Sequence, residues 1–162
     1  MKKIFKIIIF FLIINTSAKA ETEKNNEVST YFLSLKYSEA NLRVGPSKNY
    51  PIKLKYIFPT MPLEVKDKFQ KWRKVVDFEK NEGWIHVRLL SENRYGIIKQ
   101  NDKKYVNIYN KPDGKLIGRI GIGNVVELKK CREKWCKIKI EKYKGWLKQV
   151  NIWGILDNEN FD

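Results

Sequence analysis

The sequence has little of several residue types that support chemistry or cross-linking. It holds one histidine, two cysteines and five prolines in 162 residues. Acidic residues are also few, because 18 Asp and Glu stand against 33 Lys and Arg, for a net charge of +15. Beyond the first 14 residues no apolar run approaches the roughly 20 residues that a membrane-spanning helix needs. These shortages argue against metal, redox and membrane-spanning functions. The rest of the composition, 43% hydrophobic and 13% aromatic, is that of a globular protein.

The N-terminal 20 residues have the pattern of a secretory signal peptide. Three lysines precede an apolar run at 7–14, and Ala18-Lys19-Ala20 forms a small-residue cleavage site. We expect cleavage after Ala20 and export to the periplasm or cell envelope; the alternative is an uncleaved anchor. The polar residues 21–30 are predicted to be a flexible leader. Removing residues 1–20 leaves a charge of +11.

The body of the chain contains two copies of one unit. Residues 63–72 match residues 126–135 at an offset of 63, with Glu64 and Glu127 in register. Residues 83–85 match 145–147 at an offset of 62, and residues 41–46 match 107–112 at an offset of 66. Three anchors in the same order predict a duplication. We place the units at 31–95 and 96–154, followed by a C-terminal tail at 155–162.

Each copy is predicted to consist of short strands. Apolar and polar residues alternate over 40–44, 72–77 and 84–89, and no amphipathic helix of convincing length is present. Prolines and glycines punctuate both copies, and Gly118, Gly121 and Gly123 are expected to permit a tight turn or bulge. The sequence therefore predicts an all-β fold of two small closed barrels or sandwiches. A unit of about 60 residues buries only about 60% of its unfolded surface, so we expect the two copies to dock.

The motifs of the first copy carry a family resemblance. Ala-Asn-Leu-Arg-Val-Gly-Pro-Ser at 40–47, the spacing to Trp72, and Gly83-Trp84-Ile85 resemble the bacterial SH3-like domain family of cell-envelope proteins. The resemblance covers about residues 31–153 and is to the tandem, exported type with no enzyme attached. It implies two tandem SH3-like β-barrels and recognition of cell-wall peptide. In the second copy Tyr109 and Lys111 stand where the pattern has Arg and Gly.

Cys131 and Cys136 are expected to form a disulfide. They flank a hairpin position and would lie opposite each other on antiparallel strands, in an oxidising compartment. On the chain-entropy model this short loop contributes about 2 kcal/mol. The alternatives are free thiols, or redox or metal chemistry. A redox motif would need C-x-x-C, and a metal site would need two more ligands.

Aromatic side chains are the candidates for ligand binding, since amphipathic rings bury much area at low entropic cost. The ligand-binding candidates in the first copy are Arg43, Tyr50, Trp72 and Trp84, and the second set is Tyr109, Trp135 and Trp146. The alternative for Trp84 and Trp146 is packing across the open end of a barrel.

Lysine dominates the positive charge, 27 to 6 over arginine. A net positive charge draws a protein toward anionic surfaces, although a lysine-biased composition gives the same pattern. We expect no nucleic-acid partner, because a reader of phosphates would use more arginine and export removes the usual target.

No catalytic residue, metal site or cofactor is predicted. His86 is interpreted as a lone surface histidine, and Glu64 and Glu127 repeat a structural role. The sequence therefore predicts an exported, non-catalytic envelope module that binds peptidoglycan or an extended peptide segment of an envelope protein. Two alternatives stay open: a basic scaffold that docks an acidic envelope protein, and an enzyme such as a wall hydrolase.

Overall fold

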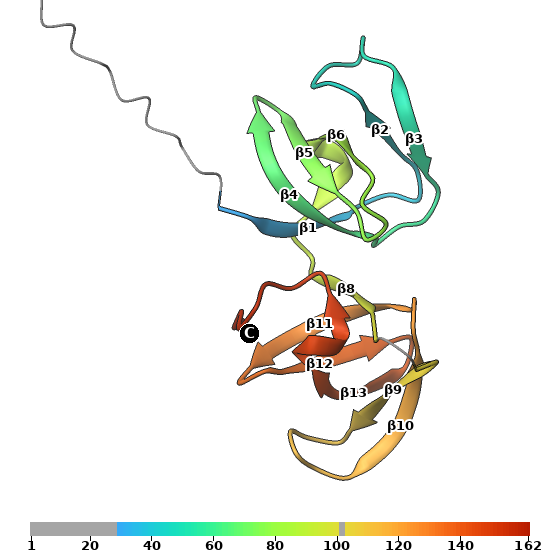
Figure 1. The fold of residues 1–162 in the computed structure, drawn as a ribbon, viewed down its shortest axis with the longest axis vertical. Helices are drawn as coiled ribbons and strands as arrows, with labels where there is room; N and C mark the ends of the chain where they lie inside the picture. The colour runs from blue at the N-terminus through green and yellow to red at the C-terminus, as the bar shows by residue number, and fades with distance from the viewer. Residues whose placement is uncertain (1–28, 101–102) are drawn as a thin grey trace, which may run out of the picture.

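The computed structural model describes residues 29–100 and 103–162, so the predicted signal peptide and most of the predicted leader lie outside the described residues. Two antiparallel sheets of seven strands each follow one another along the chain (Figure 1). The strands of the first sheet, here the first repeat, are β1 (Tyr31–Leu35), β2 (Ala40–Arg43), β3 (Ile52–Tyr56), β4 (Pro62–Phe69), β5 (Trp72–Val76), β6 (Glu82–His86) and β7 (Leu90–Ser91). Those of the second repeat are β8 (Tyr95–Ile98), β9 (Tyr105–Tyr109), β10 (Leu116–Gly121), β11 (Val125–Arg132), β12 (Trp135–Ile140), β13 (Tyr143–Lys148) and β14 (Ile152–Trp153).

The two sheets have the same topology. Their strand orders are β3-β2-β6-β5-β4-β1-β7 and β10-β9-β13-β12-β11-β8-β14. The two orders coincide when each strand is matched with the seventh strand after it. The registers agree as well: Trp72 pairs with His86 as Trp135 pairs with Lys148. Arg43 pairs with Trp84 as Tyr109 pairs with Trp146. The duplication and all-β fold predicted from the sequence are confirmed.

Each repeat has its own core, built by the side chains that alternate inward along the strands. In β13, Gly145 and Leu147 are buried while Lys144 and Lys148 are exposed. The larger buried side chains of the first core are Leu35, Leu42, Tyr56, Leu63, Val65, Val75, Ile85 and Leu90. Those of the second core are Ile98, Val106, Ile120, Val126, Leu128, Ile138, Leu147 and Ile152, together with the two cysteines. The opposite faces of the strands are therefore left for solvent or ligand.

The strand expected over 84–89 ends earlier than predicted. β6 stops at His86, and Val87–Leu89 form the 3₁₀ turn η1. The His86 side chain accepts a hydrogen bond from the Arg88 N–H at 3.2 Å, which caps the turn. The chain then continues into β7 at Leu90. The second repeat has a 3₁₀ turn at the equivalent place, η2 (Gln149–Asn151), but its N-cap residue Lys148 makes no side-chain capping hydrogen bond. Alternation alone does not reveal a turn whose residues keep the apolar-polar pattern of a strand.

The glycines of β10 and the following turn behave as predicted. The pairing of β10 with β9 shifts register between Leu116 and Gly118. Gly123 has a φ of +81°, in the left-handed region that glycine adopts without steric cost.

Cys131 and Cys136 form the predicted disulfide, with a Cα–Cα distance of 4.1 Å. They lie directly opposite each other on β11 and β12. The Cys131 N–H and C=O bond to Phe161 on the other side, at 2.9 and 3.0 Å, so the cysteine pair occupies a non-hydrogen-bonded position. Both cysteines are fully buried, so the bond is part of the second core.

The C-terminal tail packs on the second repeat. Phe161 forms a β-bridge with Cys131, and Asp162 pairs with Lys130 and Arg132. Glu159 accepts hydrogen bonds from both Nη atoms of Arg94, one of them at 3.0 Å, and one from the Leu156 N–H at 2.9 Å. A bidentate arginine-carboxylate pair of this kind combines charge with fixed geometry.

Tail docking should depend on pH through Glu159. Desolvation raises the pKa of this carboxyl, but the hydrogen bonds from Arg94 and the Leu156 N–H outweigh it, so the pKa lies below 4.5. A depressed folded-state pKa contributes stability that is full above the unfolded value and is lost as pH falls through the folded one. Proteolytic cleavage of residues 155–162 should therefore stay slow at neutral pH and accelerate below about pH 4. Glu159→Gln should release the tail at neutral pH; equal cleavage of both proteins at pH 7 would contradict the assignment.

The two repeats contact each other through Trp153 at the end of β14. Its ring packs edge-on against Phe32 at 5.3 Å and against Phe78 at 5.6 Å between centroids. Both partners belong to the first repeat, and Figure 1 shows β8 leading away from that repeat into the second. The docking expected from the small size of the units therefore has a named anchor. The described part of the chain has no helix of the length and apolarity that a membrane span requires.

Candidate functional site

The outward face of four neighbouring strands is equivalent in the two repeats. In the first repeat these are β3, β2, β6 and β5, and in the second they are β10, β9, β13 and β12. Alternation places every second side chain of these strands away from the core. All seven candidate ligand residues lie on or beside this face. We call the two surfaces the first outer face and the second outer face.

The first outer face brings its candidate residues together. Arg43 lies opposite Trp84, and its Nη1 donates to the Tyr50 carbonyl at 2.7 Å. The Tyr50 ring packs over Gly45, where an added Cβ would lie 2.6 Å from the ring. Trp72 contacts the His86 ring edge-on at 5.2 Å, and it is diagonal to Trp84 on the adjacent strand. Trp72 and Trp84 are half-buried, so part of each ring stays accessible.

The lysines of the first outer face have carboxylate or carbonyl partners. Lys55 pairs with Glu39 at 2.9 Å and Lys74 pairs with Glu82 at 2.7 Å. The Lys53 amine donates to the Glu82 carbonyl at 2.8 Å.

The histidine of this face adds little charge. Burial, followed by the charges of Arg88, Lys48 and Lys71, lowers the pKa of His86 below 6.5, so the ring is mostly neutral at pH 7. Glu39 and Glu82 therefore offset part of the lysine charge, and the first outer face keeps a small net positive charge from Arg43 and Lys53.

The second outer face is aromatic in the same places. Tyr109 and Trp135 meet edge-on at 5.4 Å, and Trp146 lies between Tyr109 and Lys137 in the register. Trp135 is only 6% exposed, because Tyr109 and Lys148 cover it. Trp146 and Tyr109 remain half-buried. The accessible ring area of the second set therefore comes mainly from these two residues.

The cations of the second outer face lack carboxylate partners. Five of them project from β10, β12 and β13, and among the described residues none forms an ion pair: Arg119, Lys137, Lys139, Lys144 and Lys148. Two are held over rings instead. Lys148 lies 5.6 Å from the Trp135 ring centroid, and Arg119 lies 4.8 Å from that of Tyr105. Such cation-π contacts fix a cation without neutralising it.

A hollow of about 450 Å³ opens on this face between β9, β10 and β13. Arg119 and Lys148 line it from opposite sides, with the side chains of Asn107 and Asn151 and the phenol of Tyr109 between them. Each of these groups can donate a hydrogen bond, and no described Asp or Glu lines the hollow. The arrangement suits an anionic group.

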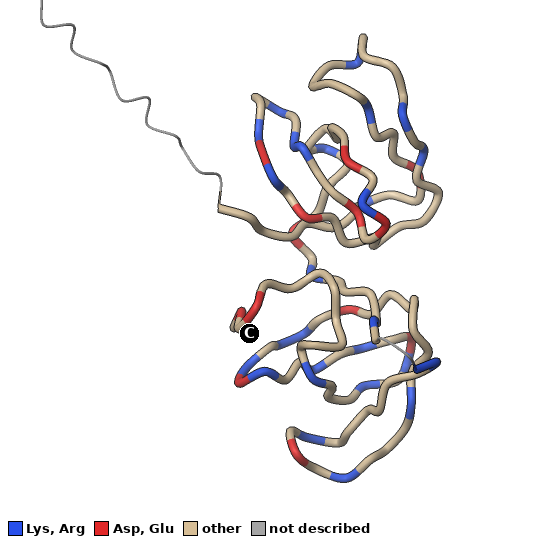
Figure 2. Tube along the Cα trace, viewed as in Figure 1, with Lys and Arg blue, Asp and Glu red and all other residues tan. Residues whose placement is uncertain are grey.

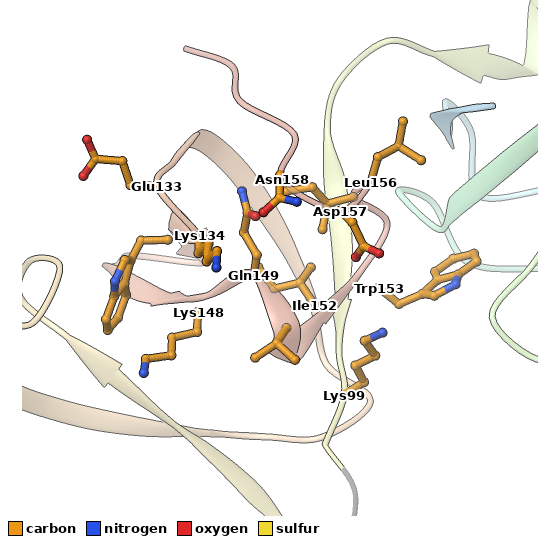
Figure 3. A pocket seen from close by; sticks show the side chains of 13 residues that line it. Lys99, Glu133, Lys134, Lys148, Gln149, Ile152, Trp153, Leu156, Asp157 and Asn158 are labelled. Atoms are coloured by element: carbon orange, nitrogen blue, oxygen red, sulfur yellow. The ribbon is translucent and has the colours of Figure 1, made fainter. Parts of the chain in front are cut away.

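A second hollow, of about 460 Å³, lies around the corner of the same repeat, against the tail (Figure 3). It shares Lys148 with the first hollow, and Lys99, Lys134 and Trp135 also line it. Glu133 and Asp157 line it too, so its charge is mixed. Of these two hollows, the one on the outer face has the more positive lining.

The sequence interpretation of the remaining polar residues agrees with their contacts. Glu64 and Glu127 each pair with the lysine two residues further along the same strand, Lys66 and Lys129. Their repeated role is structural in both copies. Within residues 29–100 and 103–162, no group of three or more His, Cys, Asp or Glu is placed to hold a metal ion.

The architecture is that of two tandem SH3-like β-barrels, which defines the class of protein. The family model described as bacterial SH3 domain matches the chain twice, at residues 36–92 and 102–154. The chain belongs to the bacterial SH3 domain family, as the resemblance of its motifs predicts.

Two solved structures are similar to the chain at low identity. NlpC1 from Trichomonas vaginalis is 13% identical with a TM-score of 0.34, over 76% of this chain and 45% of that one. NlpC2 from the same organism is 12% identical with a TM-score of 0.33, over 77% and 48%. The chain thus spans less than half the length of either structure. No curated protein matches the sequence.

The sequence interpretation did not single out the cations of the second outer face. From the sequence they are indistinguishable from the other basic residues. The strand register shows that five of them share one surface: Arg119, Lys137, Lys139, Lys144 and Lys148. A signal was present nonetheless: the segments 105–109, 116–121, 135–140 and 143–148 contain no Asp or Glu.

Proposed function

We propose that the protein is an exported, non-catalytic binding module of the cell envelope that recognises peptidoglycan or an extended peptide segment through its outer faces. The proposal includes the predicted signal peptide and a location in the periplasm or cell envelope. A buried disulfide is in keeping with an oxidising compartment. Membership of a bacterial SH3 domain family supports a binding role.

The observation that carries the proposal is the repetition of one aromatic arrangement. Trp72 and Trp84 in the first repeat, and Trp135 and Trp146 in the second, occupy equivalent positions on adjacent strands. They lie on the outward side of the sheets, while each repeat has a separate aliphatic core beneath. Trp135 is covered by Tyr109 and Lys148, but Trp72, Trp84 and Trp146 stay partly accessible, and accessible indole rings are typical anchors for ligands.

The test is co-sedimentation of residues 21–162 with purified cell wall at low and at high salt. Binding that persists at high salt indicates a specific groove, because charge attraction alone is screened. Trp84→Ala should weaken binding by about tenfold, the loss typical of an interface anchor. Phe58→Ala is the matched control, since this ring is 63% exposed on a loop of the same repeat. Equal affinity of folded Trp84→Ala and the parent protein would refute the aromatic groove.

A second candidate function is a basic scaffold that docks an acidic envelope protein. The unpaired cations of the second outer face favour it. It predicts that wall binding disappears with salt while an acidic protein partner can be crosslinked to the second repeat. Release of soluble wall fragments on incubation would instead point to an enzyme.

A further inference from the structure

The two repeats differ in charge more than their common fold requires. Residues 96–154 carry 15 Lys and Arg against five Asp and Glu, whereas residues 31–95 carry 13 against seven. In Figure 2 the basic positions recur along the strands of the second repeat, while the acidic ones lie at turns, on β11 and in the tail. The excess is therefore concentrated on the sheet surface.

The register places like charges together on the second outer face. Lys139 on β12 lies directly opposite Lys144 on β13. Directly opposed like charges destabilise a strand pair. At the equivalent place the first repeat pairs Val76 with Glu82. The second repeat thus carries a repulsion that the first avoids and that a bound anion would relieve.

The rings of this face act mainly as supports for cations. Trp135 is buried beneath Lys148 and Tyr109, and the Arg119 guanidinium lies over the Tyr105 ring. The Trp135 ring is therefore closed to stacking on nucleobases, the contact that single-strand binders use, and Arg119 covers the Tyr105 ring. Recognition on this face is accordingly by charge and hydrogen bonding.

We propose that the second outer face binds an extended polyanion, a polymer that carries phosphate or carboxylate groups along its chain. One anionic group would occupy the hollow between Arg119 and Lys148, where Asn107 and Asn151 donate further hydrogen bonds. The following groups would lie along Lys137, Lys139 and Lys144 on the adjacent strands. The inference deepens the proposed function, on which it rests, by naming the ligand chemistry and the repeat that binds it.

A polymer fits the geometry better than a single small ion. Neighbouring strands are about 4.8 Å apart, so Lys148 on β13 and Arg119 on β10 are separated by two strand spacings, or about 10 Å. The cations continue beyond the hollow onto β12. Simultaneous contact with all of them requires anionic groups spaced along one chain.

The test measures binding of residues 21–162 to sodium polyphosphate, poly-L-glutamate and neutral dextran, by titration calorimetry at several salt concentrations. The first two probes separate phosphate from carboxylate as the source of the anion. We expect binding to at least one of them, none to dextran, and a linear fall of log affinity with log salt. Arg119→Gln/Lys148→Gln should weaken binding by about tenfold and lower the salt slope by about two.

The matched control is Lys55→Gln/Lys74→Gln. It removes two charges from the equivalent strands of the first outer face, where both lysines have glutamate partners. We expect its affinity to change by less than about twofold. An equal loss in the two variants would show attraction by net charge alone and overturn the proposal. All four substituted side chains are at least partly exposed, and equal melting temperatures would confirm that both variants are folded.

Two further outcomes would also overturn the inference. One is binding to phosphatidylglycerol vesicles without binding to either polymer, which would assign the face to a membrane surface. The other is tighter binding to an oligothymidylate than to polyphosphate of equal phosphate number, which would show base stacking. Failure of the proposed function is distinguishable, because wall co-sedimentation can be lost while the purified polyanions still bind.

Discussion

Substitution of Gly145 by alanine should destabilise the second repeat by about 3 kcal/mol, the upper range for overpacking a core. An added Cβ would lie 2.2 Å from Ile108 Cγ2 and 3.2 Å from the Tyr109 carbonyl oxygen. Both neighbours belong to β9, which is held against β13 by the pairing of Tyr109 with Trp146. Relief of the clash must therefore separate the two strands at the middle of the second outer face.

The first repeat provides an independent copy of this experiment. A Cβ on Gly83 would lie 2.7 Å from both the Arg43 carbonyl oxygen and Leu42 Cγ. The Gly-Trp motif thus has one physical meaning in both repeats: the glycine admits the neighbouring strand, and the tryptophan that follows it points outward. We expect Gly83→Ala to cost a similar free energy.

Gly118→Ala is the control for both substitutions. Nothing lies within 4 Å of a Cβ added there, so its effect should stay within about 0.5 kcal/mol. Urea denaturation of the three variants measures the free energies of unfolding. A cost at Gly145 no larger than that at Gly118 would refute the close-approach explanation.

Much of the architecture could be predicted from the sequence because the two copies within the chain can be aligned with each other. Matching Trp72 with Trp135 and Trp84 with Trp146 fixes the strands and their equivalence before any contact is known. The disulfide follows from the same alignment, since it puts Cys131 and Cys136 across a hairpin. Glycine and tryptophan spacings therefore predict two similar β-units, barrels or sandwiches, and the family resemblance adds that they are barrels.

The candidate surfaces were less predictable for two physical reasons. Simple alternation from the Leu116–Tyr109 pair would place Arg119 opposite the buried Val106. The bulge between Leu116 and Gly118 shifts the register, so Arg119 lies opposite Asn107 on the outer face. The low net charge of the first outer face depends on pairs such as Lys55 with Glu39, which lie far apart in sequence but adjacent in the sheet. The tail residues lack any period and dock through individual ion pairs.

Replacement of Trp153 by alanine should uncouple the two repeats. The side chain contacts Phe32 and Phe78 of the first repeat, and truncation of this half-buried ring should cost about 2–3 kcal/mol. This loss falls on the contact between units that are each small for independent folding. We therefore expect one cooperative calorimetric transition in the parent protein and two separated transitions in Trp153→Ala, with a larger radius of gyration in X-ray scattering.

Val150→Ala is the control for this change, because Val150 is 74% exposed on η2 and close in sequence to Trp153. It should leave the single transition within about 0.5 kcal/mol of the parent. One unchanged transition in Trp153→Ala would show that the repeats are coupled by other contacts.

If the repeats do separate, the mutual orientation of the two outer faces is set by this one ring. The affinity of Trp153→Ala for a long polymer that spans both faces should then fall, while its affinity for a short polyanion on the second face should stay unchanged. Only the long ligand depends on the effective concentration that a fixed orientation of the two faces provides.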